Sequence, residues 1–416
     1  MRVQRMSLAI LALAAAAIGA RGAADLTVSL SPPRDSVSLV VYGNADLTLV
    51  REVRTVSLPA GQAELCLAWP GAAVDASSVS LRAPAGVKVS AAAQPPGKRD
   101  QMRWLLEAET AGPRELQITY FTSGIEWKPR YRLTLNEGTG AVELEGLVTI
   151  RNRSGQEFER SHTYLVVGEL KLVENLAKAA WKALPEYKDQ KDEPPPAAGS
   201  GLSERYVYDV GSVPRLALDD TYTLPFLPAA TISRAEILYR LHPAKYGAAV
   251  HKVVVFDNTP DSALGGIPIA GAEAQVATVT ASGRLPQGRA AVPYTPVGED
   301  CEVDLGTAPD VVGERRVARQ QRTSFEFDRF GQVEGYDDRE WVEVELNNHS
   351  LHPIVVEYTD TVPGVWDVAS EASYLEEGMN EVKFRIEMKP QSKEQLEYRL
   401  IKRQGKRVRL GPVRPK

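Results

Sequence analysis

A hydrophobic period of two residues runs through this sequence and limits the folds open to it. In the last hundred residues, Val342, Val344 and Leu346 alternate with glutamates, and the same period returns over residues 382–388 and 396–400. Successive side chains of a strand point to opposite faces. The period therefore predicts strands with one face on a core and the other in solvent.

Strands are predicted through most of the chain. They cover residues 36–42, 47–58, 63–68, 77–82, 87–93, 114–121, 130–135, 142–152, 164–172, 232–241, 249–257, 273–281 and 290–295, with more in the last hundred residues, where Phe325 and Phe327 also alternate with polar residues. Residues 295–318 show no period and are expected to be irregular. With 32 Gly and 28 Pro available for turns, the pattern predicts an all-β protein. It would have several antiparallel β-sandwich domains, one short helix and a disordered linker.

Composition divides the chain into seven expected segments. These are a signal peptide at 1–24, an N-terminal β domain at 25–98, a second β region at 99–187, a flexible linker at 188–204, a middle β region at 205–320, a C-terminal β-sandwich at 321–401 and a basic tail at 402–416. Charge, three prolines and Gly/Ser residues favour the linker. The helix is expected at residues 173–184, where Leu176, Ala180 and Leu184 share one face.

The first residues have the layout of a secretory signal peptide. Arg2 and Arg5 precede an apolar run at residues 6–18, and small residues follow up to Ala24. The run is too short to span a bilayer as a helix. We expect cleavage between Ala20 and Asp25 and a periplasmic or secreted protein. No later segment approaches 18 apolar residues, so an integral membrane protein is not expected.

The net charge of the chain limits the class of partner that it can bind. The chain has 49 Lys and Arg against 54 Asp and Glu; removal of Arg2, Arg5 and Arg21 with the leader leaves 46 against 54, a net charge of −8. An acidic chain argues against a nucleic-acid partner. The basic tail at 402–416 either contacts anionic wall polymer or lipid head groups, or is a solvated end.

An aromatic-rich stretch at residues 119–136 is expected to be a strand that crosses between sheets. Its alternation breaks at Ser123-Gly124 and resumes afterwards. Pro129 excludes a helix there. Trp127 and Tyr131, four residues apart, lie on one face of an extended chain. We expect their rings to fill the junction between the sheets.

This stretch also carries a resemblance. Trp127, Pro129 and Tyr131, leading into a strand, resemble the start of the second domain of the mucoidy inhibitor A-like family, bacterial envelope proteins described largely as domains of unknown function (DUF). Residues 58–82 are similar to the family's N-terminal domain. Residues 99–187 would be the first part of its C-terminal β region, and residues 279–294, 298–300, 312–316 and 344–356 resemble later landmarks of that region.

The chain lacks the coiled-coil insertion that many members of this family carry between the two domains. The resemblance implies β-sandwich domains and a location in the cell envelope. It brings no catalytic residues, because none is agreed for the family.

Familiar catalytic motifs are missing. The sequence has no nucleophile elbow, phosphate-binding loop, zincin helix or EF-hand loop. His349 and His352 would face opposite sides of a strand, which is poor for a shared metal. We therefore expect no catalytic, cofactor or metal residues. Cys66 and Cys301 either pair in an oxidising compartment or remain buried free thiols.

Four aromatic residues after the linker are the candidate binding residues. Tyr206, Tyr208, Tyr222 and Phe226 would form either a platform for a sugar or peptide, or strand positions re-entering a core.

Together these features predict an exported, non-catalytic cell-envelope protein. It would bind a protein or polymer partner through sandwich loops or sheet edges. The alternative is a hydrolase of cell-wall or surface polysaccharide. That enzyme would need two carboxylates about 5 to 10 Å apart across a cleft, one with a raised pKa.

Overall fold

A computed structural model describes residues 27–43, 45–167, 206–232, 234–262, 264, 266–280 and 283–410 of the chain. The expected signal peptide at 1–24, helix at 173–184 and linker at 188–204 lie outside these residues. The all-β prediction is confirmed. In the described residues the one α-helix is α2 (Pro243–Tyr246), of 4 residues.

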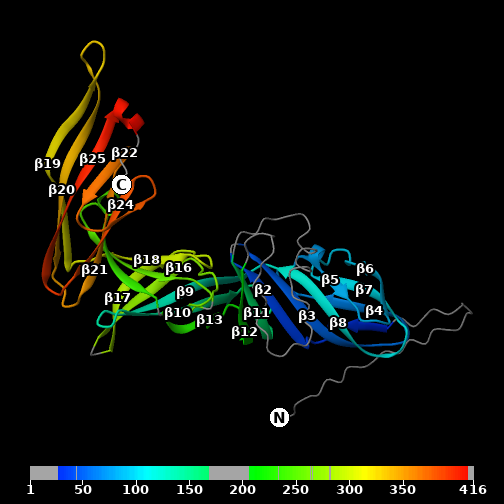
Figure 1. Cartoon of the computed structure of the whole chain (residues 1–416). Helices are drawn as coiled ribbons and strands as arrows, with labels where there is room; N and C mark the ends of the chain where they lie inside the picture. The colour runs from blue at the N-terminus through cyan, green and yellow to red at the C-terminus, as the bar shows by residue number, and fades with distance from the viewer. Residues whose placement is uncertain are drawn as a thin grey trace, which may run out of the picture.

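The strands form five sheets, numbered here in the order in which they pack (Figure 1). Sheet 1 contains β1 (Thr27–Leu30), β4 (Gly61–Ala68), β7 (Gln101–Ala108) and β6 (Val87–Ala93). Sheet 2 contains β12 (Tyr206–Leu216), β11 (Phe158–Val167), β2 (Ser36–Tyr42), β3 (Leu47–Leu58), β8 (Gly112–Thr122) and β5 (Ser80–Arg82), with the 3₁₀ turn η1 (Ala76–Ser78) before β5.

Sheet 3 contains β13 (Thr221–Ile232), β10 (Ala141–Asn152), β9 (Ile125–Asn136), β16 (Ala272–Thr280) and β17 (Gly283–Val292). Sheet 4 contains β18 (Asp300–Thr307), β15 (Val250–Asp257), β14 (Glu236–Leu241), β21 (Ile354–Thr361), β24 (Glu381–Met388) and β23 (Tyr374–Glu377). Sheet 5 contains β19 (Val311–Phe327), β20 (Val333–Asn348), β25 (Ser392–Gly405) and β22 (Val365–Ser370), and the 3₁₀ turn η2 (Lys406–Leu410) follows β25.

Most strand pairs are antiparallel, but the sheets are mixed. β1 pairs with β4, β2 with β11, β9 with β16 and β14 with β21 in parallel. Each parallel pair joins strands that are distant in sequence. The sheets consequently combine segments from several of the expected regions: sheet 2 takes strands from residues 25–98, 99–187 and 205–320.

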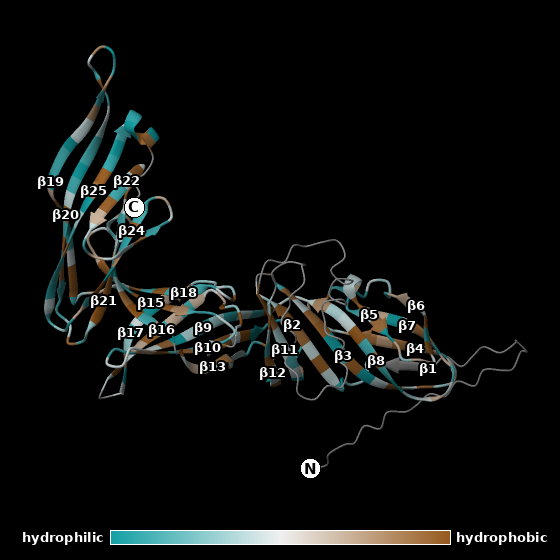
Figure 2. Ribbon diagram, viewed as in Figure 1, coloured by the Kyte–Doolittle hydropathy of each residue, from teal (hydrophilic) through white to brown (hydrophobic). Residues whose placement is uncertain are grey.

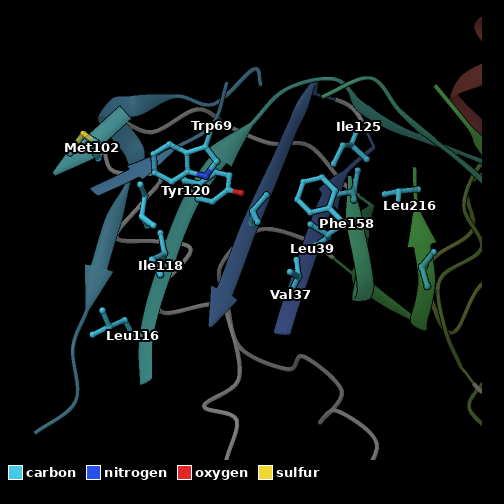
Figure 3. Packing of buried hydrophobic residues seen from close by; sticks show 14 of the residues in the cluster. Val37, Leu39, Trp69, Met102, Leu116, Ile118, Tyr120, Ile125, Phe158 and Leu216 are labelled. Atoms are coloured by element: carbon cyan, nitrogen blue, oxygen red, sulfur yellow. The ribbon is translucent and has the colours of Figure 1, made fainter. Parts of the chain in front are cut away.

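Three large cores lie between successive sheets. The first fills the space between sheets 1 and 2 and extends onto the start of sheet 3 (Figure 3). The second lies between sheets 3 and 4, and the third between sheets 4 and 5. The strands that line them alternate between hydrophobic and hydrophilic residues (Figure 2). That alternation is the period of two in the sequence, with the apolar face on the core.

Sheets 3 and 4 each serve two cores. In β9, Ile125 and Trp127 belong to the first core, whereas Leu133 belongs to the second. In sheet 4, Val254 faces the second core and Tyr358 the third. The molecule is therefore a continuous series of sandwiches with shared walls.

Gly124 makes the turn by which the chain leaves sheet 2 for sheet 3, at the break that the alternation shows. Its φ is +87°, and a Cβ placed there would lie 2.6 Å from the carbonyl oxygen of Arg153. A side chain at this position meets both a strained backbone and a steric clash.

Residues 295–318 differ from the expectation of an irregular stretch. They include β18 and the first part of β19. In the distal half of β19 neither face is covered: from Arg316 onward most residues are exposed. An uncovered strand shows no period of two. β18 does alternate, with Cys301 and Val303 buried and Glu302 and Asp304 exposed, and the sequence interpretation missed it. At the same end of sheet 5 as the distal half of β19, β25 continues to Gly405 and η2 to Leu410, beyond the expected start of the tail at residue 402.

Candidate interaction surface

The crossing strand is present as β9. Trp127 and Tyr131 lie on the same buried face, with exposed fractions of 6% and 0%, and the strand is continuous through Pro129. The Trp127 indole donates a hydrogen bond from Nε1 to the carbonyl oxygen of Val41 over 3.1 Å. These residues fix sheet 3 against sheet 2.

Three of the four candidate binding aromatics come together at this junction. The Tyr208 ring centroid lies 4.9 Å from that of Tyr206, 5.1 Å from that of Phe226 and 6.5 Å from that of Trp127. Tyr208 is 3% exposed and its hydroxyl donates to the carbonyl oxygen of Pro268, and burial raises its pKa. A sugar platform needs an open ring face. The Tyr208 ring instead packs within the first core.

Tyr222 stands apart from this cluster on β13. It is half-buried, and its hydroxyl lies 3.4 Å from a carboxylate oxygen of Asp220. It packs against the edge of the first core and does not share a surface with Tyr208.

The two cysteines are free thiols and do not form a disulfide. Cys66 is half-buried on β4 of sheet 1, and Cys301 is buried on β18 of sheet 4. Burial raises the pKa of the Cys301 thiol to about 11. At neutral pH this thiol is therefore un-ionised and a poor nucleophile.

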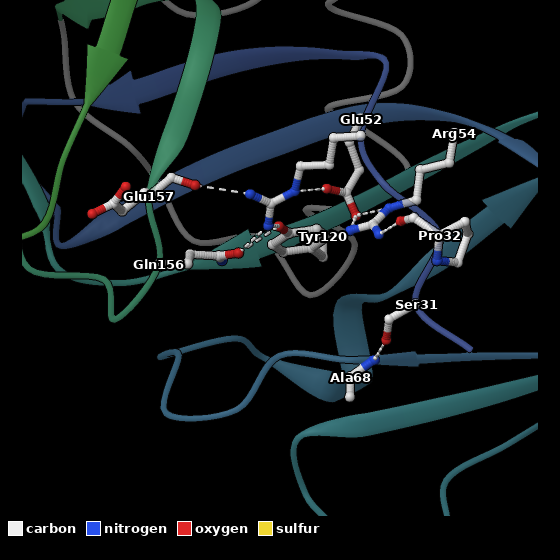
Figure 4. Close-up of polar contacts among 9 residues, drawn as sticks. Ser31, Pro32, Glu52, Arg54, Ala68, Tyr120, Gln156 and Glu157 are labelled. Carbon is white, nitrogen blue, oxygen red and sulfur yellow. Dashed lines mark hydrogen bonds and ion pairs between the residues drawn. The ribbon is translucent and has the colours of Figure 1, made fainter. Parts of the chain in front are cut away.

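A buried ion cluster in sheet 2 is a feature that the sequence reading missed. Glu52 is 0% exposed and its carboxylate accepts hydrogen bonds from Arg34 and, over 2.9 Å, from Nη2 of Arg54 (Figure 4). Arg34 also donates to the carbonyl oxygen of Glu157 over 2.8 Å. The signal was available: Glu52 and Arg54 occupy core-facing positions in the alternation of β3. The cluster ties neighbouring loops to the sheet.

A second ion cluster lies in the third core. Asp360 accepts from Nη2 of Arg315 over 2.9 Å and from the hydroxyl of Tyr398, and that hydroxyl lies 2.9 Å from the hydroxyl of Tyr358. The carboxylate of Asp360 is thus already neutralised by a cation. The arrangement stabilises the contact between sheets 4 and 5.

Carboxyl groups with displaced pKa values bear on the hydrolase alternative. A hydrogen bond from Arg240 lowers the pKa of Glu302, and one from Lys393 lowers that of Glu345. Burial acts to raise the pKa of Asp304, yet hydrogen bonds from Gly306 and His251 leave it lowered. A glycosidase acid requires a shift in the opposite direction. In the described residues no group of three or more His, Cys, Asp or Glu side chains could hold a metal ion.

A hollow of about 560 Å³ lies between sheets 3 and 4. Three cations reach it, and each faces a carboxylate: Lys252 binds Glu137, Arg385 binds Glu236 over 3.0 Å, and Arg289 binds Glu273 over 3.1 Å. Each of these cations is already paired, so the hollow offers an anionic ligand little attraction.

The hairpin of β19 and β20 projects from sheet 5 at the far end of the molecule from β4 and β7 (Figure 1). β19 is an edge strand. The register of the hairpin shifts between Val317 and Arg319 and again between Thr323 and Glu326. Such bulges twist an edge strand and hinder the addition of another strand along it. A partner at this edge would therefore contact side chains more than backbone groups.

We call the side chains of the outer hairpin and its neighbour β25 the distal surface. It consists of Arg319, Arg322, Arg329, Arg339 and Arg399 together with Phe325, Phe327, Phe330, Val333, Tyr336 and Trp341. Phe325 and Phe327, which the alternation placed against a core, are 45% and 60% exposed. Phe330 at the tip is 73% exposed and Val333 is 50% exposed.

The arginines of the distal surface have no carboxylate partner among the described residues. Elsewhere in sheet 5 the cations are paired: Arg315 with Asp360, Arg316 with Glu343, Lys402 with Glu340, Arg403 with Asp367 and Arg407 with Asp337. Asp338 lies opposite Arg322 in the register but accepts from Gln320 over 2.8 Å. Arg319, Arg322 and Arg329 are exposed and can contact an external anion. Arg339 and Arg399 are half-buried, and their Nε atoms are shielded from solvent.

Aromatic rings hold these guanidinium groups in place. Arg319 and Arg399 flank Trp341 directly across the three strands, and the Arg319 guanidinium lies 4.7 Å from the centre of the Trp341 ring. Arg322 lies 4.7 Å from the ring centre of Tyr336. Such contacts orient a guanidinium while leaving its N–H groups available.

Charge is concentrated at this end of the molecule. Residues 316–341 and 399–410 carry eleven Arg and Lys against six Asp and Glu, a net charge of +5, whereas the whole chain has −5. An anionic partner would therefore be attracted to the distal surface and repelled elsewhere.

No family model matches the chain, and no curated protein does. Within the described residues, no helix has both the length and the apolar character needed to cross a membrane.

Proposed function

We propose that this chain is an exported, non-catalytic protein of the bacterial cell envelope that binds an anionic partner through its distal surface. The observation that carries the binding role is the set of five arginines without a carboxylate partner among the described residues. The exposed rings of Phe325, Phe327 and Phe330 lie at the same end of sheet 5. The leader-like N-terminus and the resemblance to the mucoidy inhibitor A-like family support the location.

The composition of the distal surface favours binding. Arg and aromatic residues are the types most enriched at interfaces, because both bury much area at low entropic cost. Exposed apolar side chains in contact with one another, such as Phe325 and Phe327 with ring centroids 6.2 Å apart, are also typical of interaction sites. They lie on the same face of the hairpin as Tyr336 and Arg322. The register places Arg319, Arg339 and Arg399 with Trp341 on the opposite face.

The charges in the interior of the protein also support this proposal. Its ion clusters around Glu52 and Asp360 are internally neutralised, and its hollow holds paired charges. These paired charges therefore offer an external anion little attraction, in contrast to the unpaired arginines of the distal surface.

The test is binding of a soluble polyanion, dextran sulfate, to residues 25–416. The triple variant Arg319→Gln, Arg339→Gln, Arg399→Gln should weaken binding at least tenfold, since each Arg near an anionic surface contributes about 1 kcal/mol. The affinity of the wild type should fall as salt rises.

The matched control removes three exposed cations from the opposite end of the molecule, in the variant Lys88→Gln, Lys98→Gln, Arg99→Gln. Its net charge equals that of the distal variant, so it should bind almost as the wild type does. Equal losses in the two variants would mean that net charge, not this surface, governs binding, and the proposal would fail.

A further inference from the structure

We propose that the anionic partner is the surface of a lipid bilayer, and that the tip of the β19–β20 hairpin inserts Phe327, Phe330 and Val333 among its head groups. This inference rests on the proposed function, since it names the anion that the distal surface binds. It adds a second, apolar component to that binding.

The tip is built to present apolar side chains outward. Phe327, Phe330 and Val333 are 60%, 73% and 50% exposed. The turn that holds them is fixed by Asp328, whose Oδ1 accepts the backbone N–H groups of Phe330 and Gln332, each over 2.8 Å. The Asp328 carboxylate is thus already engaged in hydrogen bonds within the turn.

The shape of the tip distinguishes a bilayer from other anionic partners. A projecting loop is convex, so its apolar side chains need a medium that yields around them. Lipid head groups and the upper acyl chains do so, and aromatic side chains favour that interface. A sulfated or phosphorylated polymer can pair with the arginines, but it has no apolar interior in which Phe327, Phe330 and Val333 could be buried.

The arginines of the hairpin lie at increasing distances from its apolar tip. Arg329 lies in the turn with its guanidinium 4.7 Å from the Phe330 ring centre, so the cation can remain at the phosphate level while the ring enters. Arg322 lies five residues before Phe327 in β19, roughly 16 Å from it along the strand. Since exposed charges are largely screened beyond a Debye length of about 8–10 Å, Arg322 and Arg319 attract anionic lipids when the hairpin lies along the bilayer surface and not when it stands upright.

A second element at the same end of sheet 5 extends the surface. η2 exposes Val408 by 40% and Leu410 by 59%, with Arg409 between them. It is held against β20 by the ion pair between Arg407 and Asp337. The hairpin and η2 lie at the same end of sheet 5 (Figure 1), and both carry apolar and basic side chains.

The experiment is flotation of residues 25–416 with phosphatidylcholine vesicles, prepared with and without phosphatidylglycerol. The wild type should float with the anionic vesicles only. The tip variant Phe327→Ser, Phe330→Ser should lower vesicle binding at least tenfold and dextran sulfate binding by a much smaller factor, because the five arginines remain. The control Leu375→Ser, Met379→Ser replaces two side chains of sheet 4 that are 71% and 87% exposed, and it should float as the wild type does.

The outcomes separate the two proposals. If the tip variant floats like the wild type while the triple arginine variant does not, the insertion is wrong and the proposed function stands. Binding of the wild type to dextran sulfate without any flotation would identify a polymer as the partner and overturn the inference. If the arginine variant retains both activities, both proposals fail.

A spectroscopic readout keeps the inference testable independently of affinity. In the variant Phe330→Trp, whose tip position is open to solvent, the tryptophan emission should shift to the blue on addition of anionic vesicles and be quenched by brominated acyl chains. Vesicle binding without this shift and quenching would overturn insertion of the tip.

Discussion

The indole nitrogen of Trp127 donates a hydrogen bond to the carbonyl oxygen of Val41 over 3.1 Å, and so links β9 of sheet 3 to β2 of sheet 2. The same ring packs against Tyr208 and is 6% exposed. One side chain thus seals the junction at which the first core passes from sheets 1 and 2 onto sheet 3.

Replacement of Trp127 by Ala should lower the free energy of unfolding by about 3–5 kcal/mol, because it removes a large buried ring and leaves a cavity. Trp127→Phe keeps most of the ring but leaves the Val41 carbonyl without its donor, which costs about 1–3 kcal/mol. Urea unfolding measures both. Lys128→Ala, at the exposed neighbouring position of β9, should stay within about 0.5 kcal/mol of the wild type. A Trp127→Ala protein as stable as this control would contradict the assigned packing.

The second prediction concerns the buried carboxylate of Glu52. In Glu52→Gln the guanidinium groups of Arg34 and Arg54 lose their counter-charge inside the protein, which should destabilise it by about 3–5 kcal/mol. The matched change is Glu143→Gln, whose partner Arg284 has a side chain that is 58% exposed. That surface pair should contribute about 1 kcal/mol or less. Similar unfolding midpoints for the two variants would show that the Glu52 cluster is not required.

The third prediction follows from the raised pKa of Cys301. Its thiol ionises near pH 11 in the folded protein and around its ordinary value of 9.0 when unfolded. The unfolded state therefore holds fewer protons between these values, and stability falls as pH rises through this range, by up to about 3 kcal/mol. In Cys301→Ala that contribution disappears, together with the smaller effect of Cys301 on the pKa of Tyr131.

The check is the difference in unfolding free energy between the wild type and Cys301→Ala, measured at several alkaline pH values. The advantage of the wild type should shrink as pH rises. In the native protein, Cys301 should also resist thiolate-directed reagents at about pH 8 and react only after unfolding. Rapid native labelling of Cys301 would contradict its assigned burial.

The fourth prediction concerns the attachment of η2. Burial acts to raise the pKa of Asp337, but hydrogen bonds from Arg407 and Ser324 outweigh it and leave this pKa lowered. The contribution of Asp337 to stability is therefore complete above its ordinary pKa of 3.8 and is lost as pH falls through the lower folded value. Asp337→Asn should show a weaker loss of stability in acid.

At neutral pH the same variant should free η2. Cleavage by trypsin after Arg407 and Arg409 should become about tenfold faster, since a loss of about 1.4 kcal/mol of attachment raises the open population tenfold. Glu345→Gln, on the exposed part of the same strand, should leave the cleavage rate unchanged. Equal cleavage in all three proteins would mean that Arg407 and Asp337 do not hold the turn.

Strands with one covered face could be predicted closely from the sequence. The expected strands at residues 47–58 and 142–152 coincide with β3 and β10. In β10, Val142, Leu144 and Ile150 are buried as the alternation requires. The crossing strand at Trp127 and Tyr131 was also predicted, because a proline flanked by spaced aromatic residues leaves few alternatives to an extended chain.

The distal surface could not be predicted in this way. Phe325 and Phe327 alternate with polar residues as core positions do, but the hairpin extends beyond the strands that could cover them. Arg316 is paired and Arg319 is not, although they differ by three positions in one strand. The difference depends on a bulge at Val317 and on which residue of β20 lies opposite. Local sequence does not encode that register.

The walls shared by successive sandwiches have a mechanical consequence. Because β9 passes unbroken from the first core into the second, and sheet 4 supports the second and third together, a force applied at the hairpin is transmitted along covalent backbone and not through hinges. The described residues should therefore be rigid, and a partner bound at the hairpin should be held at a fixed distance from sheet 1.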